Sequence, residues 1–184
     1  MPISETTFER VALEDPDGKW ELHCGRLRSK LGMTAKHNSI GDRLAFRLQL
    51  QLAVDAYRVT GDRAYVRVSE TRTYIPDVAV IPMSLVERME REQPSHLEVY
   101  PDALPLVVEI WSPSTGDEDL TEKVPGYQQR GDAEIWLLHH QQRTLRAFVR
   151  EPDGSYTEHV HHGGIVRPRA LPDVAIDLDE LFDL

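Results

Sequence analysis

A charged residue inside a short apolar run constrains the fold of this chain more than any other feature. Residues Leu106 to Trp111 are mostly aliphatic and β-branched, and prolines flank them, which is typical of a strand covered on both faces of a sheet. Glu109 lies inside this run. An ionised carboxylate in a dry strand is costly unless a cation or strong hydrogen-bond donors hold it. The run therefore predicts a buried strand that carries a carboxylate together with a compensating partner.

The residues that follow this strand extend the pattern. Ser112 to Gly116 is polar and turn-forming, and the chain then becomes acidic and helix-like up to Lys123. A second apolar run, Tyr74 to Pro82, is interrupted by Asp77. Pro76 cannot donate to a strand ladder, so we expect this segment to cross a bulge or a sheet edge.

Asp77, Glu109 and Lys123 form the first candidate site. Two carboxylates can share one Mg²⁺ ion, which prefers oxygen ligands and keeps several waters, so that a backbone carbonyl would complete the protein's share. Such an ion neutralises a phosphate oxygen and lowers the pKa of a bound water, while Lys123 orients or deprotonates that water or stabilises the transition state. The alternative is a hydrogen-bonded Asp77 and Glu109, with Lys123 merely paired with Asp119 at i, i+4.

Length and composition predict one domain over residues 1–184. The 31 acidic residues outnumber the 21 basic ones, and the net charge of −10 argues against general nucleic-acid binding through a basic surface, although it leaves room for a local basic groove. Cys24 is the only cysteine, which excludes an intrachain disulfide and fits a reducing cytoplasm. No apolar run approaches the roughly 20 residues of a membrane helix, so we expect a cytoplasmic protein without membrane contact.

Hydrophobic periodicity predicts a mixed α/β sheet flanked by helices, with additional antiparallel hairpins. The expected helices are Thr6–Glu14, Lys36–Tyr57, Ser84–Glu92, a short helix up to Lys123, a second one opened by Pro125, and Asp179–Phe182. The expected strands are Trp20–Leu27, Tyr57–Val59, Tyr65–Ser69, Arg72–Ile81, Leu106–Trp111, Glu134–His139, Thr144–Arg150, Tyr156–His161 and Ala175–Leu178.

The long helix has apolar residues on two sides. Ile40, Leu44, Leu48 and Leu52 lie one turn apart, and a second side carries Phe46, Leu50, Val54 and Tyr57. Such a spread indicates burial by more than the helix's own sheet. Either the helix is deeply packed in the core, or it forms the contact of a homodimer or higher homo-oligomer.

Three further sets of residues are candidates for a chemical role. The histidines His139, His140, His159, His161 and His162 include a pair on one strand face, but a solvent-facing hairpin explains them better than a transition-metal site. No nucleophile elbow surrounds Ser112 or Ser114, so we expect Ser114 or Thr115 to cap the next helix. The basic residues Arg26, Arg28, Lys30 and Lys36 are either a phosphate-contacting patch or a solvated loop.

Several of these stretches together resemble a known family. Ile75-Pro76-Asp77, followed after a gap by Val108-Glu109-Ile110-Trp111-Ser112-Pro113-Ser114-Thr115, is similar to the Uma-two family of bacterial restriction endonuclease-type proteins, which belongs to the PD-(D/E)XK nuclease superfamily. The likeness continues over nearly the whole chain, through Trp20-Glu21-Leu22, Asp119-Leu120, Glu134-Ile135-Trp136-Leu137 and Asp177-Leu178-Asp179-Glu180-Leu181-Phe182.

The resemblance implies a restriction endonuclease-like fold and a Mg²⁺-dependent endonuclease, with Mn²⁺ as a substitute, that acts on DNA. It implies metal ligands at Asp77, Glu109 and the carbonyl of Ile110, with Glu21 supporting the metal or its water. The superfamily's usual lysine position is Trp111 here, and the resemblance implies that Lys123 on the following helix supplies the amine. It also places His37 at the cleft and Tyr127 behind the ligands.

Two departures from the family pattern concern the region after the strand. Pro125-Gly126 follows Lys123 where a regular helix is expected, and His139-His140 replaces an acidic residue. Two other functions remain open: a catalytically inactive nucleic-acid- or protein-binding module on the same fold, because a fold does not fix a function, and a hydrolase of smaller phosphodiesters.

Overall fold

The computed structural model describes residues 2–30, 32–112, 116 and 119–183, and the expected helix cap at Ser114 or Thr115 lies outside them. The helical elements are α1 Glu5–Glu14, η1 Pro16–Gly18, α2 Ala35–Gln51, α3 Met83–Glu92, η2 Asp119–Lys123, α5 Val124–Arg130 and α6 Leu178–Phe182. The strands are β1 Trp20–His23, β2 Arg26–Ser29, β3 Tyr57–Gly61, β4 Tyr65–Ser69, β5 Arg72–Tyr74, β6 Val78–Pro82, β7 Val99–Tyr100, β8 Leu106–Ile110, β9 Glu134–His139, β10 Thr144–Arg150, β11 Tyr156–His161, β12 Ile165–Val166 and β13 Ile176–Asp177.

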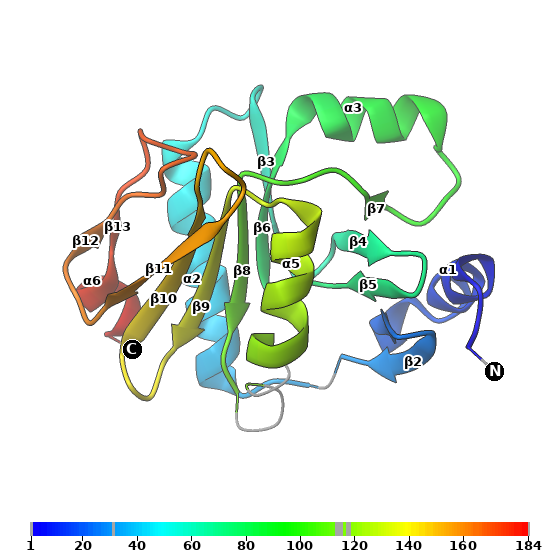
Figure 1. Ribbon diagram of the computed structural model, residues 1–184, viewed down its shortest axis with the longest axis horizontal. Coiled ribbons are helices and arrows are strands. Elements are labelled where there is room, and N and C mark those ends of the chain that lie inside the picture. Colours follow the sequence, from blue (N-terminus) through cyan, green and yellow to red (C-terminus); the bar gives the residue numbers. More distant parts are fainter. Residues whose placement is uncertain (1, 31, 113–115, 117–118, 184) are drawn as a thin grey trace.

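A six-stranded mixed sheet forms the centre of the molecule. Its strand order is β11-β10-β9-β8-β6-β3, in which β8 and β9 are parallel and the other neighbours are antiparallel. Figure 1 shows α2 on one face of this sheet and α5 on the other. Two buried clusters separate accordingly, one between the sheet, α2 and α6, the other between the sheet, α3 and α5. The mixed α/β architecture expected from the sequence is confirmed.

Strand β8 is buried at every position, as its apolar sequence predicts. Val108 and Ile110 pack in the cluster on the α2 side, and Val107 packs in the cluster on the α5 side. Because side chains alternate along a strand, Glu109 belongs to the α5 side with Val107. The fold therefore aims this carboxylate at α5 and the helical turn before it.

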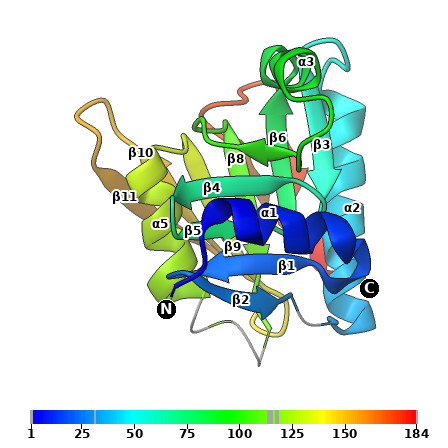
Figure 2. The same ribbon diagram turned by 90° about the vertical axis from the view of Figure 1, so that its right-hand side faces the viewer.

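A second sheet, in the order β2-β1-β5-β4-β7, lies beside the first and packs against α1 (Figure 2). The segment Arg72–Ile81 was expected to be one strand disturbed at Pro76. The chain instead leaves the second sheet after Tyr74 and enters the central sheet at Val78, so the proline marks a crossing between two sheets. Residues 75–77, including Asp77, form that crossing.

Two element boundaries differ from expectation. Trp20–Leu27 is a hairpin rather than one strand, because Cys24 and Gly25 both adopt positive φ, 49° and 76°, which is the geometry of a two-residue turn. The long helix ends at Gln51 rather than at Tyr57, since Tyr57 pairs with Pro82 and opens β3. The apolar spacing runs past the helix end because the helix and the strand both face the same core.

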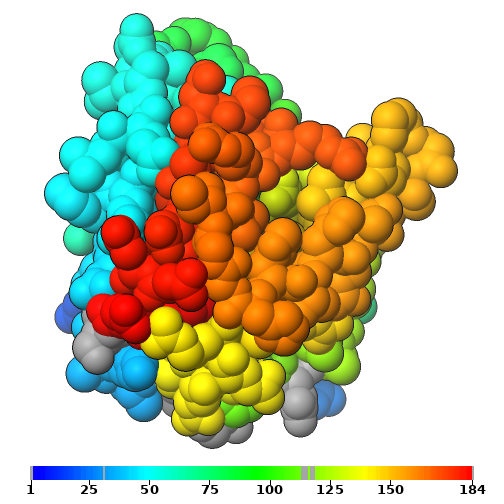
Figure 3. Space-filling model, turned by 90° about the vertical axis from the view of Figure 1, so that its left-hand side faces the viewer, coloured from blue at the N-terminus to red at the C-terminus, as the bar shows by residue number. Residues whose placement is uncertain are grey.

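One side of α2 is uncovered in the single chain. Phe46 and Leu50 are 58% and 69% exposed, and Val54, just after the helix, is 85% exposed. The expectation that these residues lie in a deep core is wrong. Figure 3 shows why: the C-terminal segment (red) and the neighbouring strands (orange) pack beside α2 (cyan) and leave its outer side open.

The C-terminal half follows the sequence closely. β9, β10 and β11 begin and end at the expected residues, and β10 and β11 form the expected hairpin. His159 is exposed and His161 partly exposed on the edge strand β11, as expected of a solvent-facing hairpin. No helix in the described part of the chain is long and apolar enough to cross a membrane.

Candidate active site

The two carboxylates come from neighbouring points of the central sheet: Glu109 lies in β8, and Asp77 directly precedes β6. β6 and β8 pair antiparallel with Val78 opposite Val108, and continuing this register by one residue places Asp77 opposite Glu109. Directly opposed residues of an antiparallel pair have Cβ atoms about 5 Å apart. Asp77 is 6% exposed and Glu109 is 1% exposed. The pairing inferred from two interrupted apolar runs is therefore present in the fold.

Asp77 is held by cations and a backbone donor. The Ile110 amide donates to Oδ2 at 2.6 Å, the Lys30 ammonium lies 2.8 Å from Oδ1, and His37 Nε2 lies 3.2 Å from Oδ2. Burial alone would raise the pKa of Asp77, but the Lys30 ammonium and the His37 hydrogen bond hold it well below its usual range. Asp77 is thus an ionised, oriented carboxylate.

Lys30 belongs to the candidate site, although its sequence neighbourhood predicts either a phosphate-contacting patch or a solvated loop. Its side chain is 5% exposed, and its Nζ lies 2.6 Å from Asp62 Oδ1 and donates to the Ile75 carbonyl at 2.7 Å. Arg26, Arg28 and Lys36 are exposed, as in the solvated-loop alternative. No spacing in the sequence distinguishes Lys30 from these neighbours, because its partners arrive from the crossing at residue 75–77 and the end of β3.

Glu109 lies in a different environment on the α5 side. The Tyr127 hydroxyl donates to its Oε1 at 2.5 Å, and the Lys123 Nζ lies 3.3 Å from the same oxygen. Burial raises the pKa of Glu109 to about 8. The Lys123 ammonium lowers this pKa, but the nearby charges of Asp119 and Asp77 raise it again, so the net shift stays upward. Tyr127, expected behind the predicted ligands, is in direct contact with Glu109.

Lys123 reaches the carboxylates through an unusual helical turn. Residues Asp119–Lys123 form a π-helical turn, and α5 begins at Val124 with Pro125 in its first turn, so one helical segment ends at Lys123 and the next opens at the proline as the sequence predicts, with no gap between them. The wide turn precedes a proline that has no amide hydrogen to give. The Lys123 Nζ lies 3.1 Å from Glu21 Oε1 and 3.6 Å from Asp119 Oδ1, so the i, i+4 pair exists but is the longest of its three ion pairs.

Glu21 links the two sheets at this point. Its Oε1 accepts the Ile75 amide at 2.7 Å, and its Oε2 lies 2.9 Å from His23 Nε2. Burial would raise the pKa of Glu21, but the Lys123 ammonium and the His23 hydrogen bond lower it to about 2. Glu21 thus fixes both Lys123 and the backbone two residues before Asp77.

A cleft of about 420 Å³ opens onto one side of this cluster. Asp77, His37 and Ile110 line it, together with Lys19, Met33, Asn38, Gly41, Asp42, Gly61, Asp62 and Arg63. His37 Nε2 lies 3.0 Å from the Ile110 carbonyl oxygen, so the predicted position of His37 at the cleft is observed. Glu109, Lys123 and Glu21 are not among the lining residues. Of the predicted metal ligands, Asp77 and Ile110 are the two that line the cleft.

The donor set fits a hard divalent cation. Four buried carboxylates, Glu21, Asp77, Glu109 and Asp119, share two buried ammonium groups, Lys30 and Lys123, among the residues that the structure describes. An excess of buried acid of this kind requires protons or a cation. Among the described residues no three His, Cys, Asp or Glu side chains converge as a metal cluster. A site of two carboxylates, one carbonyl and several waters, which suits Mg²⁺, needs no such triplet.

Trp111 occupies the position where the superfamily's signature places a lysine. Its ring stacks on His139 with the centroids 4.1 Å apart. The aromatic pair fills the position next to the strand end, and the buried lysine near Glu109 is Lys123, from the turn before α5. His139, which stands near the end of β9 where the family pattern has an acidic residue, therefore packs against Trp111 and leaves the carboxylate cluster intact.

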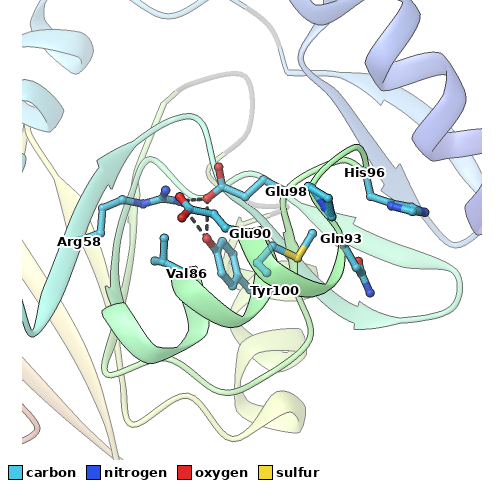
Figure 4. Close-up of a pocket in the computed structure, with 9 residues that line it drawn as sticks. Arg58, Val86, Glu90, Gln93, His96, Glu98 and Tyr100 are labelled. Atoms are coloured by element: carbon cyan, nitrogen blue, oxygen red, sulfur yellow. Dashed lines mark hydrogen bonds and ion pairs between the residues drawn. The ribbon is translucent and has the colours of Figure 1, made fainter.

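A second pocket, of about 260 Å³, lies between α3 and β7 and has no part in this cluster. Figure 4 shows its polar groups turned toward one another: Arg58 pairs with Glu98, and the Tyr100 hydroxyl donates to Glu98 at 2.6 Å. Because its polar groups satisfy each other and no buried lysine–carboxylate set lines it, this pocket offers no comparable chemistry.

Comparison with known proteins agrees with this geometry. A crystal structure from Anabaena variabilis ATCC 29413, described as a "putative nuclease belonging to DUF820", superposes with a TM-score of 0.72 at 17% identity and covers 89% of each chain. No curated protein matches. This likeness shows the restriction endonuclease-like fold. The sequence model of the Uma2 family, described as "Putative restriction endonuclease", matches residues 6–179, and the chain therefore belongs to the Uma2 family of nuclease-type proteins.

Proposed function

We propose that this protein is a Mg²⁺-dependent endonuclease that hydrolyses phosphodiester bonds of DNA. The family and fold support a nuclease in general. The observation that carries the finer proposal is that Asp77, directly before β6, lies next to Glu109 of the adjacent strand β8, with Ile110 at the cleft and Lys123 on Glu109. This arrangement supplies oxygen ligands and a fixed positive charge to one place.

Each residue has a chemical task in this proposal. Asp77, Glu109 and the Ile110 carbonyl would hold the ion, which neutralises a phosphate oxygen and makes a bound water a better nucleophile. Lys123 holds Glu109 in place and contributes positive charge toward the developing pentavalent phosphorus. Glu21 fixes Lys123, and Tyr127 fixes the Glu109 carboxylate from behind.

The decisive experiment is cleavage of supercoiled plasmid in Mg²⁺ or Mn²⁺, with EDTA as the blank. Asp77→Asn and Glu109→Gln should each lower the rate by at least about 10³-fold, because each removes an ion ligand. Glu14→Gln, at an exposed position at the end of α1, is the matched control and should cleave like the wild type. Wild-type protein that leaves plasmid intact under all these conditions refutes the proposal.

Thermal unfolding separates catalysis from ion binding. Mg²⁺ or Mn²⁺ should raise the melting temperature of the wild type, because a ligand that binds only the folded state stabilises it, and Asp77→Asn should abolish the rise. Ion-dependent stabilisation without any cleavage would indicate a binding module. Cleavage of a chromogenic phosphodiester but not of plasmid would indicate a hydrolase of smaller phosphodiesters.

We propose in addition that a second copy of this chain covers the outer side of α2. Phe46, Leu50 and Val54 follow one another at intervals of four residues and are uncovered. In an antiparallel pairing with its two-fold axis at Leu50, Phe46 of one copy faces Val54 of the other, as an isologous contact requires. Light scattering should show a dimer for the wild type and a monomer for Phe46→Glu, whereas a monomeric wild type excludes the pairing.

A further inference from the structure

The cleft beside Asp77 must admit an anionic phosphate although acids dominate its inner end. Its lining contains the acids Asp42, Asp62 and Asp77 and the cations Lys19 and Arg63. Lys19 pairs with Asp62, so its charge is already compensated. The buried Lys30 next to the cleft is likewise taken up by Asp62 and Asp77. Most of the positive charge near the cleft is therefore committed to the protein's own carboxylates.

Arg63 is different from these lysines. It is exposed, it lines the cleft, and in the part of the chain that the structure describes it makes no ion pair or hydrogen bond through its side chain. It follows directly on Asp62, whose amide donates to the Asp77 carbonyl at 3.1 Å, and Gly61 pairs with Val78. The backbone that carries Arg63 is thus tied to the backbone of a predicted metal ligand.

We propose that Arg63 binds a backbone phosphate of the nucleic-acid strand, next to the phosphate that is hydrolysed. This inference rests on the proposed function, and it names the group that holds the substrate. A guanidinium suits this task because its planar fork of donors matches two phosphate oxygens. The Arg63 side chain is exposed and can adjust to the phosphate, while its backbone stays at a fixed position relative to Asp77.

The residues of α2 that line the cleft include one feature that attracts an anion and one that repels it. An anion is attracted by the first turns of α2, through His37, Asn38 and Gly41, where the helix dipole is positive. It is repelled by Asp42, which is exposed and has no partner among the described residues. Arg63 and Asp42 are thus opposite uncompensated charges on the cleft, and they should affect phosphate binding in opposite directions.

The test compares binding of a short fluorescent DNA duplex, in Ca²⁺ and over a series of salt concentrations, for wild type, Arg63→Ala, Arg63→Lys and Arg10→Ala. Arg10 is an exposed arginine of α1 that lies outside the cleft and serves as the matched control. Arg63→Ala should weaken binding about tenfold and reduce the slope of log Kd against log salt by about 0.9, the value of one lost phosphate contact. Arg63→Lys should keep the slope.

Cleavage kinetics give the second readout. Arg63→Ala should raise KM about tenfold and leave kcat within about twofold, because the contact is made equally in the ground state and the transition state. Asp42→Asn should tighten binding. An Arg63→Ala variant that matches Arg10→Ala in both slope and KM overturns this inference while the wild type still cleaves. A wild type that neither binds nor cleaves DNA overturns the proposed function, and this inference falls with it.

Discussion

Asp77 and Glu109 come from neighbouring points of the central sheet, but their surroundings differ in almost every respect. Asp77 lines the cleft and is met by Lys30, His37 and a backbone amide, so it stays ionised. Glu109 is buried on the α5 side and shares a single ammonium with Glu21 and Asp119. One carboxylate is paired before any ion arrives, and the other lacks enough positive charge. The difference shows that the charge of Asp77 is already compensated by the protein, whereas the buried carboxylates around Glu109 need a proton or a further cation.

The largest effect should appear when each acid is made neutral in the absence of divalent ions. Asp77→Asn should destabilise the fold by about 3 kcal/mol, because the buried Lys30 loses one of its two carboxylates. Glu109→Gln should cost far less and should stabilise the protein at pH 9, because it removes a carboxylate that burial disfavours as an anion. Urea unfolding in EDTA measures both. Equal losses for the two variants would mean that the two surroundings do not differ.

The pH dependence of stability gives the next effect. The pKa of Glu109 rises from an ordinary value of 4.5 to about 8 on folding, so its proton favours the folded state. The stability that this group contributes is complete below pH 4.5 and is lost as the pH rises through 8. In EDTA the free energy of unfolding should therefore fall between pH 5 and pH 9 by an amount on the order of 4 kcal/mol.

Glu109→Gln is the control for this pH effect, since the amide does not titrate and should remove most of the decline. Asp77→Asn should leave the decline in place, because the pKa of Asp77 lies below the range tested. If the free energy of unfolding of Glu109→Gln falls with pH as much as that of the wild type, another group causes the fall.

The sequence predicted the acids of this site better than the cations. Asp77 and Glu109 interrupt apolar strands, and a charge in such a place is visible in the sequence because burial is costly. Lys123 was proposed from the sequence, but its spacing equally allows a simple pair with Asp119, and Tyr127 was placed through the resemblance. Lys30 follows a strand of exposed residues, and only the crossing at residues 75–77 brings its carboxylate partner to it.

The same reasoning explains which parts of the fold were predicted. β9, β10 and β11 were placed correctly because short apolar or β-prone runs and a Pro-Asp-Gly turn determine them locally. The end of α2 and the passage between the two sheets were not, because they depend on which partner strand accepts Tyr57 and Val78. Local pattern determines element type, and tertiary pairing determines where elements end.

A smaller change should alter the Glu109 side alone. Tyr127→Phe removes the hydroxyl that donates to Glu109 Oε1 at 2.5 Å and leaves the ring in its buried position. We expect a loss of about 1 kcal/mol in EDTA, the usual worth of one hydrogen bond, and a weaker response of the melting temperature to Mn²⁺ because the carboxylate is less well oriented. Tyr65→Phe, a buried tyrosine of the second sheet, is the matched control and should keep the full Mn²⁺ response. An undiminished response in Tyr127→Phe would mean that the hydroxyl does not orient the ligand.

The smallest effect should come from His37 on the Asp77 side. Burial lowers the pKa of this imidazole, but the hydrogen bond and charge of Asp77 outweigh it, and the net pKa is raised. A raised pKa means that His37 stabilises the fold below pH 6.5 and that this contribution is lost as the pH rises through the higher folded value. His37→Gln should therefore cost at most about 1 kcal/mol at pH 6 and less at pH 9, since an amide can keep one of the two contacts. His96→Gln, at an exposed position, should show no such difference between the two pH values. If the cost of His37→Gln is the same at both, Asp77 is held by Lys30 and the Ile110 amide alone, and the cleft side of the site is prepared without the histidine.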